Sequence, residues 1–244
     1  MKTLNGSIPV LLAFALLLLP RMEMAQQAES RVPLRDNSDW WSGLRPAASD
    51  EVRNEQEREV SGSNFEIAGI KLGENFFEQA AKKLGKAAVV RRGDAASGRE
   101  QICYVSSNKD KKIHLVFERG EIVERFYLFA GGKTWKGEEV CKSSEQIRWE
   151  TSTASGLRLG LTQEQVIAIL GKPSLRQKDQ LIYFLHVTKK YTEEDLKVVR
   201  KNNPNLSEDE LHRNYESYDW SASFELKFAD SKLTFLAVSV AETT

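Results

Sequence analysis

Length, composition and charge set the first limits on this chain. Its 244 residues, of which 41% are hydrophobic and 29% charged, have the composition of a globular protein that can bury a core. The 35 basic and 35 acidic residues cancel, so the chain has no net charge to attract DNA, RNA or an anionic membrane surface. We therefore expect no nucleic-acid partner.

The first 25 residues are typical of an export signal. Lys2 precedes an apolar stretch of 12 residues at 8–19, which Pro20 ends. Spanning a bilayer takes about 20 apolar residues, so we predict a cleaved signal peptide at 1–25. The alternative is an uncleaved anchor, because Glu23 occupies a position where cleavage favours a small residue. Either way the protein is expected in the periplasm, cell envelope or extracellular space, and it would contact a membrane only through an uncleaved N-terminal segment.

The next segment, at 26–64, is polar, charged and interrupted by proline and glycine. A segment with so few apolar residues cannot bury a core, so we predict a disordered tether. Trp40 and Trp41 stand out within it. The alternatives for these two indoles are docking on the folded body and docking on a partner.

A first α+β unit is predicted at 65–141. Its helix begins after Asn75 as N-cap, has Glu78 three positions on, and ends before Gly85. Three strands of an antiparallel meander follow at 101–106, 113–118 and 122–129. Alternation in the middle strand predicts one inward face and one outward face. The inward residues are Ile113, Leu115 and Phe117, and the outward residues are His114, Val116 and Glu118.

Cys103 and Cys141 are the two cysteines of the chain. In an exported chain an even cysteine count favours a structural disulfide. A redox-active pair would need close spacing or an electropositive neighbourhood, and neither is visible here. The three histidines are scattered and show no zinc-type spacing, so we expect no metal and no cofactor.

A second α+β unit is predicted at 142–244. Thr162 and Gln165 form a capping box at the start of its helix, and Gly171 followed by Pro173 ends it. Its strands are expected at 180–187, 223–228 and 233–240, with a turn at Asp230 and Ser231 between the last two.

The second unit carries an insert at about 189–219, where the first has a short turn. Thr192 and Ser207 are both helix starts, which predicts a helical hairpin around 202–204. The alternatives are a decorated surface loop and a binding element. Aromatic residues are enriched in interfaces, and those of the insert are the reason to keep the second alternative open. The candidate partner-binding residues are Tyr191, Tyr215, Tyr218 and Trp220.

The two units repeat one pattern about 87 residues apart. GIKLG at 69–73 and LGK at 84–86 recur as GLRLG at 156–160 and LGKP at 170–173, and QICY recurs as QLIY. We therefore predict an α+β fold of two tandem helix-plus-antiparallel-meander repeats, whose sheets either join or remain separate.

The stretch from GLRLGLTQEQV to LGKP resembles the SmpA/OmlA domain of small lipoproteins that accompany outer-membrane β-barrel assembly. The tandem arrangement is similar to the fold of the secreted β-lactamase inhibitory protein. The chain lacks a cysteine after its apolar stretch and has one cysteine pair rather than one per repeat. The resemblance implies one concave sheet and a function in binding other proteins.

No catalytic pattern accompanies this architecture. The chain contains neither G-x-S-x-G nor H-E-x-x-H, and its paired glycines are not followed by the lysine of a phosphate loop. His114, His186 and His212 are expected to be structural or surface residues. We predict an exported non-catalytic protein-binding module whose partner is a protein of the envelope or extracellular space. It would use the exposed sheet face together with the insert.

Two alternatives from other classes stay open. The first is an envelope structural or assembly accessory factor held near the membrane by its N-terminal segment. The second is a hydrolase with an unrecognised site.

Overall fold

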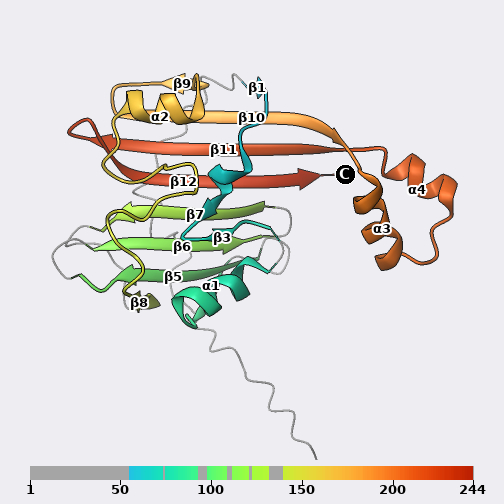
Figure 1. Cartoon of the computed structure of the whole chain (residues 1–244), viewed down its shortest axis with the longest axis horizontal. Helices are drawn as coiled ribbons and strands as arrows, with labels where there is room; N and C mark the ends of the chain where they lie inside the picture. The colour runs from blue at the N-terminus through green and yellow to red at the C-terminus, as the bar shows by residue number, and fades with distance from the viewer. Residues whose placement is uncertain are drawn as a thin grey trace, which may run out of the picture.

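A ten-stranded mixed sheet forms the body of the protein (Figure 1). The computed structural model describes residues 55–73, 75–92, 98–108, 112–120, 123–131 and 140–243. Helices α1 (Phe76–Leu84) and α2 (Gln163–Leu170) cover one face of the sheet, so the chain has an α+β fold. The expected signal peptide at 1–25, with Trp40 and Trp41, lies outside the described residues. Among the helices that are described, none has the length and apolarity to cross a membrane.

Two antiparallel meanders make up most of the sheet. They meet where β7 pairs with β12, from Phe129 opposite Phe235 to Val123 opposite Ala241, so the two halves share one sheet. The first meander consists of β5 (Arg99–Ser106), β6 (Ile113–Arg119) and β7 (Val123–Ala130). The second consists of β10 (Gln180–Lys190), β11 (Ser217–Ala229) and β12 (Lys232–Thr243).

Four short strands lie at the edges of this sheet, and two more form a separate hairpin. At the edges lie β1 (Gln56–Glu57), β4 (Val89–Arg92), β8 (Lys142–Ser144) and β9 (Leu175–Arg176). Strands β2 (Glu66–Ile67) and β3 (Ile70–Lys71) pair with each other after the 3₁₀ turn η2 (Gly62–Phe65). β1 and β8 run parallel to their neighbours, which makes the sheet mixed.

The two covering helices begin differently. Thr162 accepts a hydrogen bond from the backbone N–H of Gln165 and the Gln165 side chain bonds back, which confirms the predicted capping box of α2. Asn75 precedes α1 in the left-handed conformation, with φ 62°, and its side chain makes no capping bond. The expected side-chain cap at Asn75 is therefore wrong: a residue in this conformation turns the chain into the helix instead, which asparagine tolerates better than most residues do.

The middle strand of the first meander is buried on both faces, contrary to the expectation of one outward face. His114, Val116 and Glu118 are at most 1% exposed. Their face carries a second apolar cluster, separate from the main core beneath the helices. The members of this cluster are Cys103, Val116, Tyr127, Phe129, Phe235 and Ala237, with Cys141 packed against them. The alternation of residues along β6 could not predict that its second face is covered, because the residues that cover it come from distant parts of the sequence.

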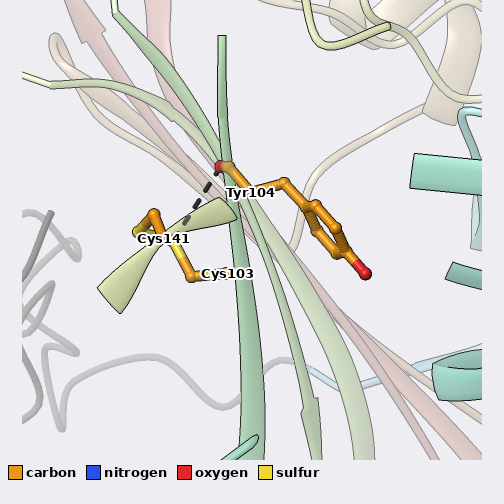
Figure 2. The surroundings of a disulfide bond; sticks show 3 residues. All are labelled: Cys103, Tyr104 and Cys141. Atoms are coloured by element: carbon orange, nitrogen blue, oxygen red, sulfur yellow. Dashed lines mark hydrogen bonds between the residues drawn. A yellow bond between two sulfur atoms is a disulfide. The ribbon is translucent and has the colours of Figure 1, made fainter. Parts of the chain in front are cut away.

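The predicted disulfide between Cys103 and Cys141 is present, with the two Cα atoms 4.5 Å apart. Figure 2 shows the bridge on one side of β5 and the Tyr104 ring on the other. Because neighbouring residues in a strand point to opposite faces, Cys103 belongs to the second cluster and Tyr104 to the main core. The bridge fixes Cys141 against the face opposite the helices.

The predicted boundary of the disordered tether at Asn64 is wrong, because ordered structure already begins at residue 55. Residues 55–64 follow the folded body: β1 pairs with β10, and Asn64 is 3% exposed. The Arg58 guanidinium donates to the carbonyl oxygens of Leu170, at 2.8 Å, and Lys172, at 3.0 Å. These carbonyls lie at the end of α2, where helix carbonyls lack partners within the helix and a cation is favoured. Backbone pairing and one cation hold this segment, so it needs no apolar pattern.

The insert forms the predicted helical hairpin. Helices α3 (Glu193–Asn202) and α4 (Glu208–Asn214) each begin with a complete capping box, at Thr192 and Ser207. β10 and β11 extend further than expected and pair as far as Lys190 opposite Ser217. The two helices therefore lie beyond the end of the sheet, next to the C-terminal end of β12 (Figure 1).

Candidate functional site: a hollow beside the inserted helices

A hollow of about 610 Å³ lies on the helix-covered face at the end of the sheet where the insert leaves it. Its apolar residues come from the segment before α1 and from the two long C-terminal strands; they include Val60, Phe65, Leu72, Trp220 and Val240. Three cations and three carboxylates also line it. These are Lys71, Arg119, Lys189, Glu59, Glu124 and Glu242. A mixed apolar and charged lining suits a protein segment better than a purely apolar ligand.

Trp220 forms the inner wall of this hollow. Its side chain is 5% exposed, and its ring meets the Phe65 ring edge to face at a centroid distance of 5.7 Å. The Nζ atom of Lys189 lies 4.8 Å from the centre of the indole and 2.6 Å from a carboxylate oxygen of Glu59. We expected Trp220 as an exposed anchor, and the structure differs: alternation along β11 turns it into the core.

The three tyrosines of the insert form one cluster, in which all three side chains are partly exposed. The Tyr191 ring lies 5.5 Å from Tyr215 and 4.9 Å from Tyr218, measured between ring centres. Tyr218 stands two residues before Trp220 on β11, so both side chains point to the same face of the sheet. The structure thus brings the three tyrosines together and places Trp220 on the face that Tyr218 shares; we call these four residues the aromatic surface (Tyr191, Tyr215, Tyr218 and Trp220).

The charges of nearby carboxylates act on two of the three tyrosines, Tyr191 and Tyr218. Burial raises the pKa of Tyr218, and the charges of Glu242, Asp195 and Glu59 raise it further. Burial likewise raises the pKa of Tyr191, with contributions from Tyr215, Glu242, Tyr218 and Asp195. Both phenols therefore stay protonated at neutral pH, in a locally negative environment.

Sequence reasoning missed the charged residues around the aromatic surface. Lys189 lies opposite Tyr218, and Glu242 lies opposite Trp220, in the paired strands. The signal that would have found them is the alternation of Val187, Lys189 and Tyr191, which continues past the expected end of the strand. Glu59 lay in the predicted tether and carried no such signal.

The opposite sheet face carries a polar row across five strands. Gln101, Glu118, Arg125, Ser239 and Ser223 lie side by side in register. Glu118 accepts a hydrogen bond of 2.5 Å from Gln101 Nε2, and its other oxygen lies 3.6 Å from Arg125. The hydroxyl oxygens of Ser223 and Ser239 are 2.7 Å apart. These contacts lie within each meander: Gln101, Glu118 and Arg125 interact in the first, and Ser223 and Ser239 in the second.

The histidines occupy separate elements and none lines the hollow. His114 stacks on Phe129 in the second cluster, His186 lies on β10 with its Nδ1 atom 3.9 Å from Glu55, and His212 lies on α4. Within the described ranges, no group of three or more histidine, cysteine, aspartate or glutamate side chains could hold a metal ion. Comparison with family models, curated proteins and solved structures found no match to this chain.

Proposed function

We propose that this protein is an exported, non-catalytic protein-binding module whose contact surface is the aromatic surface and the adjoining hollow. The observation that carries the proposal is the tyrosine cluster, which stays partly exposed and whose Tyr218 shares a sheet face with Trp220, a lining residue of the hollow. Tyrosine gives a large contact area at low entropic cost and is enriched in protein interfaces. The disulfide supports export, because such bonds persist in oxidising compartments.

We also propose that the fold arose as two copies of one helix-plus-meander unit. Tyr104 of QICY donates a hydrogen bond of 2.9 Å to the carbonyl of Gly85, and Tyr183 of QLIY donates one of 3.1 Å to the carbonyl of Gly171. Both glycines end the helix of their unit. The four glycines of GIKLG and GLRLG all have positive φ, between 70° and 128°, which explains why glycine recurs there. These equivalences support two SmpA/OmlA-like units of the kind that the motifs suggest.

The duplication makes a paired prediction. Tyr104→Phe and Tyr183→Phe should each lower the free energy of unfolding by about 1 kcal/mol, because each removes one hydrogen bond to a helix-ending carbonyl. Urea unfolding followed by circular dichroism measures the change, with Tyr215→Phe as a surface control that should remain near wild type. A loss in one variant with none in the other would contradict equivalent roles.

Affinity capture tests the binding function. The protein, purified from the cells that make it, would be used as bait in an envelope extract of the same cells. A matched bait would lack residues 191–216, with an Asn-Gly turn joining Lys190 to Ser217, which already face each other across the hairpin. We expect a partner that the first bait retains and the second loses.

Two further baits locate the contact. Tyr218→Ala together with Tyr215→Ala should weaken capture while leaving the melting temperature within a few degrees. Glu164→Gln, an exposed change on α2, should change neither. Equal capture by every bait would contradict the assigned surface. An intact N-terminus found in the membrane fraction, with no partner captured, would favour the envelope accessory factor instead.

A further inference from the structure

The hollow already contains one cation site, which the chain fills with its own lysine. Lys189 Nζ lies 4.8 Å from the centre of the Trp220 ring and 2.6 Å from the Glu59 carboxylate. An aromatic face and a carboxylate together are a favourable environment for an ammonium or guanidinium group, because the ring quadrupole and the negative charge act in the same direction.

Aromatic rings and carboxylates also lie together beside this site. The ring centres of Tyr191 and Tyr218 lie 4.9 Å apart, and Glu242 lies opposite Trp220 on the sheet face that Tyr218 shares. The charges of Glu242 and Asp195 raise the pKa of both phenols. Hydrogen bonds from Thr192 lower the pKa of Asp195, so this carboxylate remains ionised at neutral pH. In the described part of the chain, no basic side chain forms an ion pair with Glu242 or Asp195.

Two of the three positive charges of the hollow are already paired. Arg119 binds Glu100 at 2.7 Å and lies 4.6 Å from the centre of the Phe77 ring. Lys189 binds Glu59, and Lys71 lies on β3. The tyrosine end of the surface therefore presents two carboxylates, Glu242 and Asp195, with which no basic side chain of the described residues forms an ion pair.

We infer that the Tyr191–Tyr218 pair with Glu242 and Asp195 is a receptor for a basic side chain of the partner protein. An arginine or lysine would place its charged group over the tyrosine rings and against the Glu242 carboxylate, as Lys189 does with Trp220 and Glu59. This inference rests on the proposed protein-binding function and names the chemistry of the segment that the partner inserts.

Fluorescence anisotropy with labelled peptides tests the inference. The probes are twelve-residue peptides of alternating glycine with arginine, lysine, glutamine or glutamate, and the protein is the one purified from its own cells. We expect the arginine and lysine peptides to bind at least about fivefold more tightly than the glutamine peptide, with the difference shrinking as salt rises. Glutamate should bind most weakly.

Variants assign the preference to the site. Glu242→Gln and Tyr218→Leu should each reduce the affinity for the arginine peptide by about two- to fivefold, whereas Tyr218→Phe, which keeps the ring, should retain it. Glu164→Gln is the charge-matched control and should bind like wild type. Melting curves establish that all four variants remain folded.

Three results would overturn the inference: equal binding of arginine and glutamine peptides, a preference for glutamate, or a basic preference that survives Glu242→Gln combined with Tyr218→Leu. Capture of a partner that is lost with residues 191–216 would then still support the binding function with a different segment chemistry. If the peptides show no basic preference and no captured partner depends on residues 191–216, the binding proposal itself is contradicted.

Discussion

Replacing Trp220 with alanine is expected to lower the free energy of unfolding by about 3–5 kcal/mol, because truncating a buried tryptophan removes its contacts and leaves a cavity. The indole is 5% exposed, meets Phe65 edge to face and carries Lys189 above its ring, so its loss opens the junction between the N-terminal segment and β11. Urea unfolding followed by tryptophan fluorescence and circular dichroism gives the change in the midpoint and in the slope.

Two other variants show whether this loss is due to burial. Trp220→Phe keeps most of the apolar volume and should lose clearly less stability than the alanine variant. Tyr215→Ala removes a partly exposed ring that contacts Tyr191 and should lose about 1 kcal/mol or less. If Trp220→Ala unfolds like wild type, Trp220 is a surface anchor and the wall of the hollow is wrongly assigned.

Removing the disulfide is expected to have an effect of similar size. The bridge closes a loop of 38 residues, for which the chain-entropy model gives a stabilisation of about 4 kcal/mol relative to the open unfolded chain. Cys103→Ala with Cys141→Ala should therefore lower the unfolding free energy by about that amount. The second apolar cluster would also lose the residue that packs against it, since Cys141 is held there by the bridge.

A reductant supplies the matched control. Dithiothreitol should shift the urea midpoint of the wild-type protein toward that of the double variant and leave the double variant unchanged. A wild-type midpoint that does not respond to complete reduction, verified by thiol titration, would contradict a stabilising role for the bridge.

Local signals in the sequence identified the helices and hairpins well. The capping boxes at Thr162, Thr192 and Ser207 depend on residues three positions apart, so their hydrogen bonds form within one turn of the chain. The turn at Asp230 and Ser231 likewise needs only its own positive φ values of 49° and 59°. The disulfide followed from the cysteine count, since the chain offers one possible pair.

Contacts between distant parts of the chain could not be predicted from the sequence. Residues 55–64 have no apolar period because β10 and the end of α2 hold them through backbone pairing and Arg58. The second buried face of β6 depends on Phe235, more than a hundred residues away in the chain. In both cases the stabilising partner lies in another part of the chain, so no local period records it.

In the candidate site, too, the sequence predicted some features and only the tertiary structure decided others. Composition alone singled out the four aromatic residues of the insert, because aromatic side chains in a charged segment are unusual. Only the tertiary structure decided that Trp220 is buried while the three tyrosines stay partly exposed, since Tyr218 shares the face of Trp220 but lies two residues nearer the insert, where Tyr191 packs against it. It also brought Glu59, Lys189 and Glu242 to one place from three separate segments, because pairing of β10, β11 and β12 aligns residues that are far apart in the chain.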